Sequence, residues 1–391
     1  NDTDLTIFRE EADIDGFNFA FIDDHYDYHT AQDSYARMDI NSLKHQADYL
    51  MATLDYFSST ALEELKSDED HVYFNFPGLG IINYPFSWSG PLLYIGTLIF
   101  ILLLAIGRRK KMISSKGALR GFIPLLAALV CGVAFAFLGW KLLNYVHPQY
   151  QDMLHGFTYN GHLYMAAFTT LTIAMTLWIY NRGFKKTSLE DSMVAPIIFW
   201  LLLNGFIVFY LKGASFFMIP VYTMLLFMII QLYAFLNGYR LLLFALLVIP
   251  TLLFFAPLIQ MLPVGLGLTM LTASGFFTVL TITVLLPIFK TFRKGYRVSV
   301  LFLSLGLVFL ILAEWNSGFS EDRKLPNSLI YLYDTDDNTA WWGSYNNVLD
   351  AYTQQALGEE PISGSYVSET SASKYNTGIR WHPVSYTHLT L

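Results

Sequence analysis

Residues 119–143, LRGFIPLLAALVCGVAFAFLGWKLL, decide the fold of this chain. The run is almost entirely apolar, and its charged side chains, Arg120 and Lys141, lie close to its two ends. A helix of roughly 20 apolar residues crosses a bilayer core of about 30 Å. Because lipid offers no hydrogen-bond partner to the backbone, we expect this run to be a membrane-spanning helix.

Seven further apolar stretches of similar character make eight in total. They cover residues 91–107, 161–180, 193–211, 214–236, 241–258, 262–289 and 298–314. The boundary at Leu211-Lys212-Gly213 is tight, so counts of seven or nine also fit the pattern. We predict a mostly α, multi-pass transmembrane helix bundle of about eight helices over residues 90–314.

The composition divides the chain into three parts. The whole is 54% hydrophobic and only 14% charged, whereas soluble domains carry roughly a quarter charged residues. Acidic residues outnumber basic ones by 18 to 4 in residues 1–89 and by 9 to 4 in residues 315–391. Residues 90–314 reverse this balance, with 16 basic and 4 acidic side chains. We therefore expect a soluble acidic part on each side of the membrane region.

The loops between the apolar stretches differ sharply in charge. Alternate loops hold 14 Lys and Arg residues, and the loops between them hold Lys212 alone. Since positive loops stay in the cytoplasm, an even number of crossings places both soluble ends on the extracytoplasmic side. This side is the periplasm or exterior in a bacterium and a vacuolar or reticulum lumen in a eukaryote. The lipid bilayer is thus an expected partner, and nucleic acid is not, because no basic face lies outside the membrane loops.

Ionisable residues of the bundle lie near the ends of the apolar stretches. Lys141, Lys212 and Glu314 occupy such positions, where long side chains reach the interface. A transporter requires ionisable groups near the middle of the bilayer. The pattern favours a membrane anchor over a transporter.

The first soluble part, residues 1–58, shows a helix–strand–loop–helix pattern. Thr3 or Asp4 can cap a short first helix, and residues 17–22 (FNFAFI) are typical of a strand covered on both faces in a parallel α/β sheet. Residues 40–57 repeat apolar side chains at helical spacing. The loop 23–34 follows the predicted strand, and open α/β sheets bind ligands at that edge.

This loop reads DDHYDYHTAQDS and contains two imidazoles and four carboxylates. Zinc binds both kinds of group, but acidic loops are also commonly just solvated. We expect His25 to be exposed. Composition alone leaves both interpretations open.

The motif Tyr28-His29-Thr30-x-x-Asp33, followed by a helix with Leu43-x-His45-Gln46, resembles the closing segment of a di-zinc aminopeptidase-like domain. The segment Thr3-Asp4-x-x-Ile7-Phe8 and the start of the tail, PNSLIYLYDTDDNTAWW at 326–342, fit the same resemblance. The chain is similar to the membrane-bound di-zinc metallopeptidases, namely the vacuolar membrane protease and endoplasmic reticulum metallopeptidase (Fxna-like) family and its bacterial relatives.

The resemblance implies a division of the chain into four parts. Residues 1–58 would be the C-terminal remnant of an α/β zinc-peptidase domain, and 59–89 a linker with a predicted strand. Residues 90–314 would be the transmembrane helices, and 315–391 a truncated β-rich extracytoplasmic domain. Residues 384–391 (VSYTHLTL) look like a translated sequencing adapter, so we expect an artefact there.

The resemblance also implies the site. His29 would be the last of five ligands to two zinc ions, and the other ligands and the general-base Glu would precede Asn1. The implied reaction is aminopeptidase-like hydrolysis of a peptide or protein substrate. Asp33 would either accept a hydrogen bond from the His29 ring or cap the next turn, and Tyr28 would line the substrate pocket or pack under the loop. No catalytic residue is assigned within this chain.

The chain opens at Asn1 within a predicted capped helix, without Met or leader, so we expect a fragment that lacks its beginning. A zinc site needs at least three protein ligands, so we also expect the fragment to be inactive. The alternative is a non-catalytic scaffold or receptor with a degenerate peptidase-like outer domain. The oligomeric state has no signal in the sequence.

Overall fold

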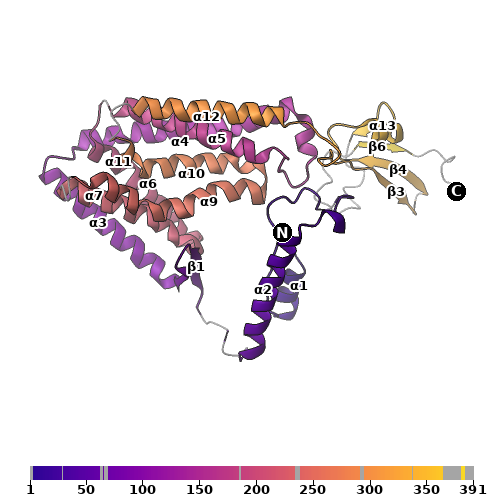
Figure 1. Cartoon of the computed structure of the whole chain (residues 1–391), viewed down its shortest axis with the longest axis horizontal. Coiled ribbons are helices and arrows are strands. Elements are labelled where there is room, and N and C mark those ends of the chain that lie inside the picture. The colour runs from indigo at the N-terminus through magenta and orange to yellow at the C-terminus, as the bar shows by residue number, and fades with distance from the viewer. Residues whose placement is uncertain are drawn as a thin grey trace. The chain divides into compact units, whose positions relative to one another are not determined.

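The structure is a computed structural model that divides the chain into two compact units, Asn1–Asp70 and His71–Leu391. Figure 1 labels the elements of both units. The structure describes residues 3–28, 30–61, 65, 69–184, 186–233, 238–290, 295–336, 338–363 and 380–383. The predicted adapter tail, 384–391, and most of the acidic stretch 62–68 lie outside the described residues.

The described residues of the first unit form two helices and one short turn. They are α1 (Asp4–Ala12), η1 (Tyr35–Arg37) and α2 (Ile40–Ser59). Thr3 is the N-cap of α1, and the Asp39 carboxylate caps α2 by accepting a 2.8 Å hydrogen bond from the Ser42 backbone N–H. The predicted starts of both helices are confirmed.

The predicted strand at residues 17–22 is wrong: this segment is extended but pairs with no strand among the described residues. A strand needs a neighbour to satisfy its backbone, and the described part of this unit offers none. The Phe17 ring instead lies 5.6 Å from that of Phe57, and the Phe19 ring lies 5.4 Å from that of Tyr49. Leu54, on the predicted apolar face of α2, is 62% exposed.

A β-hairpin begins the second unit. Strands β1 (His71–Phe76) and β2 (Gly80–Pro85) pair antiparallel, which confirms the strand predicted in the linker. The Phe74 ring lies 5.0 Å from that of Phe254 in the bundle. The Tyr84 hydroxyl lies 2.8 Å from the Ser215 hydroxyl. The hairpin is thereby held against the membrane helices.

The described residues include seven helices that are long and apolar enough to cross a bilayer, together with a shorter apolar helix, Leu268–Val284. The chain is therefore an integral membrane protein, and most of its residues are helical. The described part of this region contains both these long helices and several shorter ones. In chain order they are α3 (Ser89–Arg109), α4 (Ser115–Val146), α5 (Gly161–Gly183), α6 (Leu189–Tyr210), α7 (Met218–Tyr233), α8 (Arg240–Leu247), α9 (Ile249–Leu266), α10 (Leu271–Val284), α11 (Leu286–Phe289) and α12 (Gly295–Trp315). The 3₁₀ turns are η3 (Phe86–Trp88), η4 (Pro148–Asp152), η5 (Lys212–Phe217) and η6 (Leu268–Met270).

One predicted helix boundary is wrong. The sequence pattern placed a loop at residues 259–261, but α9 continues through them. Pro257 and Pro263 both lie within this helix, so neither starts nor ends it. The break occurs at Gly267, whose φ of +87° is a conformation that glycine adopts without strain.

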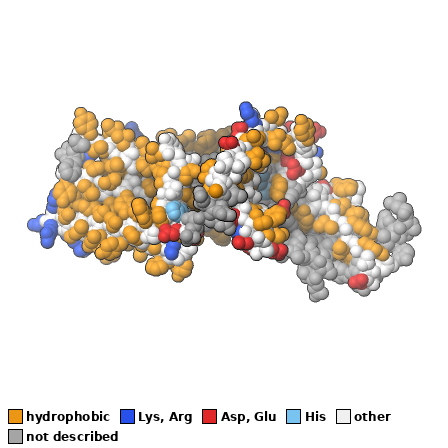
Figure 2. All heavy atoms as spheres, turned by 90° about the horizontal axis from the view of Figure 1, so that it is seen from below, with side chains coloured by type: hydrophobic (Ala, Val, Ile, Leu, Met, Phe, Trp, Pro, Cys, Tyr) orange, Lys and Arg blue, Asp and Glu red, His pale blue; other side chains and the backbone are white. Residues whose placement is uncertain are grey.

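Small residues let the helices approach closely. Helix α10 is the most enclosed, and it packs against α4, α5 and α9. At its crossing with α4, a Cβ on Gly132 would lie 2.8 Å from Val279 of α10. In contrast, α12 buries only Ser299, Gly306 and Ala313, at intervals of seven residues, where it meets α5. On the face drawn in Figure 2, apolar side chains cover much of the surface, as expected for a protein whose helices meet lipid.

The tail forms a small sheet with the strand order β3-β4-β6-β5 and antiparallel pairing. Its elements are β3 (Ile330–Asp334), β4 (Thr339–Ser344), α13 (Ala351–Leu357), β5 (Ile362–Ser363) and β6 (Arg380–Pro383). The predicted turn between two strands is confirmed, because Asp334 pairs with Thr339.

Candidate metal-binding loop

An ion pair closes the loop that carries the predicted metal ligand. The Arg37 side chain donates from Nε to Asp27 Oδ2 at 2.6 Å and from Nη2 to Asp27 Oδ1 at 3.2 Å. A bidentate contact of this kind fixes the orientation of the guanidinium relative to the carboxylate as well as the distance between them. The two residues lie ten positions apart, so the pair ties the start of the loop to η1.

Short turns fold the chain inside this closure. The Tyr28 backbone N–H donates to the His25 carbonyl at 3.3 Å, and the Thr30 N–H donates to the Asp27 carbonyl at 2.9 Å. The Thr30 hydroxyl also donates to the Asp27 carbonyl, at 2.7 Å. These bonds form two short turns, and the described residues of this segment, 25–28 and 30, lie in neither a helix nor a strand.

Two of the three predicted site residues, Tyr28 and Asp33, lie within the described part of the chain. His29, the predicted zinc ligand, lies outside the described residues. Tyr28 is 61% exposed. The exposed Asp33 donates its backbone N–H to the Thr30 carbonyl at 3.1 Å, and its carboxylate forms no hydrogen bond with any residue that the structure describes. Ser34 rather than Asp33 is the N-cap of η1. The roles of Tyr28, His29 and Asp33 stay predictions.

His25 differs from its expected exposure. Its side chain is half-buried, and its ring stacks against that of Tyr26 at a centroid distance of 6.4 Å. The expectation of an exposed ring rested on the polarity of the surrounding residues, which does not reveal local stacking.

The described residues do not assemble a zinc site by themselves. Zinc takes three or four protein ligands, and the described residues contain no group of three His, Cys, Asp or Glu side chains placed to share a metal ion. Asp27 is engaged by Arg37. Any zinc at this loop therefore needs ligands other than the described side chains around it.

Sequence reasoning missed Arg37 as an organising residue. The signal was available as two opposite charges on either side of a loop, at Asp27 and Arg37. Opposite charges ten residues apart are common, however, so spacing alone could not distinguish this pair from two solvated side chains.

Comparison with known proteins identifies the resemblance of this region. Residues 1–54 match the model of peptidase family M28. Endoplasmic reticulum metallopeptidase 1 of Rattus norvegicus is 29% identical over 143 residues, or 36% of this chain and 15% of the rat protein. The Mus musculus protein of the same name is 28% identical with the same coverage. Putative endoplasmic reticulum metallopeptidase 1-B of Caenorhabditis elegans is 33% identical over 89 residues, or 22% of this chain and 10% of that protein.

No solved structure matches the chain significantly. The chain spans about 15% of the length of the rat and mouse proteins that it matches. The matches confirm the predicted resemblance to membrane metallopeptidases of family M28.

Proposed function

We propose that this chain is part of a multi-pass, zinc-dependent membrane metallopeptidase that hydrolyses peptide bonds on the extracytoplasmic side of its membrane. The observation that carries the proposal is the order of two features along one chain. The match to peptidase family M28 covers residues 1–54, and helices long enough to cross a bilayer follow from Phe86 onward. Relatives named endoplasmic reticulum metallopeptidases support the same combination.

Within this protein, His29 is the proposed zinc ligand. The loop supports this role because the Asp27–Arg37 ion pair and the backbone hydrogen bonds of Tyr28 and Thr30 hold the described residues that flank His29 in the sequence. When bound, zinc ions polarise a carbonyl group and increase the acidity of a bound water molecule. The remaining ligands are proposed to lie in the parts of the longer protein that this chain does not include, since the match spans 15% of the rat relative.

We assign Asp33 and Tyr28 to the rim of this site. Asp33 follows His29 by four positions in the sequence, and its carboxylate accepts no hydrogen bond from any described residue, so we propose that it serves the His29 ring. Tyr28 is largely exposed and is therefore available to a substrate. The aminopeptidase type of cleavage is proposed from the resemblance of the Tyr28–Asp33 motif.

Metal analysis of the complete gene product tests the zinc assignment. We expect two zinc ions per protein, and His29→Ala should remove about one of them, because losing one ligand typically weakens metal binding strongly. His25→Ala is the matched control, since it removes an imidazole from the same loop and should leave the zinc content unchanged. Equal zinc content in His29→Ala and the unaltered protein would exclude His29 from the site.

Peptide cleavage tests the reaction class separately. An aminopeptidase releases the first residue from a peptide with a free amino terminus and leaves the same peptide intact when that terminus is acetylated. Equal cleavage of both peptides would argue for an endopeptidase. A folded, membrane-inserted protein that binds no zinc and cleaves neither peptide would establish the non-catalytic scaffold instead.

A further inference from the structure

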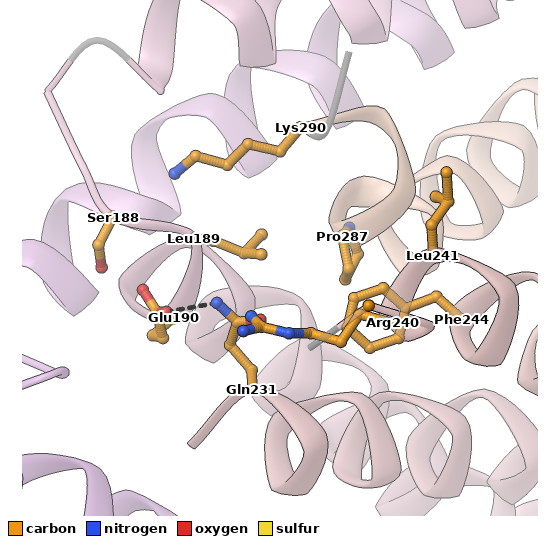
Figure 3. Close-up of a pocket in the computed structure, with 10 residues that line it drawn as sticks. Ser188, Leu189, Glu190, Gln231, Arg240, Leu241, Phe244, Pro287 and Lys290 are labelled. Carbon is orange, nitrogen blue, oxygen red and sulfur yellow. Dashed lines mark hydrogen bonds between the residues drawn. The ribbon is translucent and has the colours of Figure 1, made fainter. Parts of the chain in front are cut away.

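A cavity of about 530 Å³ lies at the end of the bundle where helices α6 and α8 begin and α7 and α11 end. This is the end that carries the loops rich in Lys and Arg. Figure 3 shows the side chains that line it. They are Ser188, Leu189, Glu190, Gln231, Gly238, Arg240, Leu241, Phe244, Pro287 and Lys290.

Hydrogen bonds hold the polar side of the cavity in place. Gln231 Nε2 donates to Glu190 Oε1 at 2.8 Å, and Arg240 Nη1 donates to Gln231 Oε1 at 3.1 Å. Gln231 thus connects a carboxylate on α6 with a guanidinium at the start of α8. The Arg240 guanidinium thereby lies at the polar side of the cavity.

Lys290 supplies a second positive charge. Figure 3 shows its side chain extending across the opening toward the first turn of α6. The ammonium lies 4.8 Å from the centre of the Phe184 ring and forms no hydrogen bond or ion pair with any described residue. Burial is the largest effect and holds the pKa of Lys290 below its ordinary value, although the nearby Glu190 and Asp191 carboxylates oppose this shift. A half-buried ammonium without a hydrogen-bond acceptor is costly, so the position favours an incoming anion.

The opposite side of the cavity is apolar. Leu241 and Phe244 of α8 and Pro287 of α11 line it. The apolar Leu241 side chain is 44% exposed. Many other apolar side chains are exposed on the face drawn in Figure 2. A ligand that contacts both sides must carry a charged group and a hydrocarbon portion.

We propose that this cavity binds a membrane phospholipid, with its phosphate between Lys290 and Arg240 and its hydrocarbon portion along Leu241 and Phe244. Basic pockets between transmembrane helices are suited to lipid headgroups. Lys290 and Arg240 supply two positively charged side chains at the cavity, and a hydrocarbon portion would cover its apolar side. Free inorganic phosphate has no hydrocarbon to cover Leu241, so it fits less well.

Binding of dioctanoyl phosphatidylglycerol to the purified chain in detergent, with sodium phosphate as the second probe, tests the site. Lys290→Gln should weaken lipid binding at least about tenfold, because a charge-assisted hydrogen bond is lost. Lys290→Arg should restore most of the affinity. Arg182→Gln is the matched control, since Arg182 stacks on Trp178 near the end of α5 and does not line the cavity.

Leu241→Gln should weaken lipid binding without involving a charge, and it provides a second test if Lys290→Gln fails to fold. The proposal is overturned if Lys290→Gln binds the lipid as tightly as the unaltered chain, or if Arg182→Gln loses as much affinity. Equal binding of sodium phosphate and the lipid would also overturn it, because the hydrocarbon portion would then contribute nothing.

Discussion

The carboxylate of Asp152, in the turn between α4 and α5, accepts hydrogen bonds from Asn347 in the tail domain. The Asn347 backbone N–H donates at 2.5 Å and its side-chain amide at 2.9 Å, both to Oδ1. The Val348 N–H donates to Oδ2 at 3.1 Å. Because Asp152 is only 2% exposed, these bonds are shielded from water and join the tail sheet to the membrane bundle.

We expect Asp152→Ala to loosen the tail domain at a cost of about 3 kcal/mol, since buried N–H groups lose a charged acceptor. Limited proteolysis should then cut the segment after α12 faster than in the unaltered chain. Glu359→Gln is the control, because it removes an exposed carboxylate from the same domain. Equal cleavage rates for Asp152→Ala and Glu359→Gln would show that other contacts hold the domain.

A second buried carboxylate joins two helices at the opposite end of the bundle. Asp191 Oδ1 accepts a 2.8 Å hydrogen bond from the backbone N–H of Ser114, the residue that caps α4. We expect Asp191→Ala to destabilise the bundle by about 2 kcal/mol, because the Ser114 N–H loses a hydrogen bond to a charged group. Unfolding by increasing fractions of denaturing detergent measures this change. Lys116→Ala, an exposed change in the first turn of α4, should leave the unfolding midpoint in place.

Alanine substitutions at two glycines are expected to have opposite effects on the stability of the bundle. A Cβ on Gly132 would lie 2.8 Å from Val279, so Gly132→Ala should separate α4 from α10 and cost about 1–3 kcal/mol through overpacking. A Cβ on Gly205 would meet no atom within 4 Å, so Gly205→Ala should be neutral or slightly stabilising through helix propensity. Both are measured by the same detergent titration. A similar loss in both variants would mean that glycine flexibility, and not the helix crossing, matters at these positions.

Helix α13 should lose stability in acid. Burial raises the pKa of Asp350, but hydrogen bonds from the Thr353 backbone and side chain and from Asn327 outweigh it, so the net pKa lies below its usual value. A lowered folded-state pKa stabilises the fold above the unfolded value of about 3.9 and loses that contribution as the pH falls through the folded value. Hydrogen exchange of α13, corrected for its intrinsic pH dependence, should accelerate below about pH 4.

Asp350→Asn is the companion variant for this prediction. Asparagine caps a helix about as well as aspartate but carries no charge, so α13 should persist in this variant and show no acid-dependent loss of protection. An equal acid response in both forms would assign the effect to another carboxylate.

The sequence predicted those elements that depend on local pattern. The apolar runs from α3 to α7 and at α12, the Asp39 cap of α2 and the β3–β4 hairpin all follow from hydrophobic spacing, capping chemistry and turn residues. The boundary expected between residues 258 and 262 is wrong, because α9 continues through it with Pro257 and Pro263 inside the helix, and Gly267 ends it. In a membrane bundle, neighbouring helices compensate for the backbone groups that proline frees.

The strand predicted at residues 17–22 and the Asp27–Arg37 closure show what local pattern cannot supply. A strand depends on a partner elsewhere in the fold, and an ion pair depends on how a loop folds. The zinc prediction has the same character, since it rests on His29 and on ligands distant in sequence. Such features depend on tertiary contacts, and the spacing of apolar residues along the sequence does not predict those contacts.

The enclosure of α10 has a consequence for how the protein adapts to membranes of different thickness. With 14 residues, α10 is only about 21 Å long at 1.5 Å per residue, shorter than a typical hydrocarbon layer. Protein rather than lipid surrounds it, so acyl-chain length does not act on it directly. The 21-residue helices α3 and α12 face lipid along most of their surface and bear the strain of a thicker or thinner bilayer by tilting.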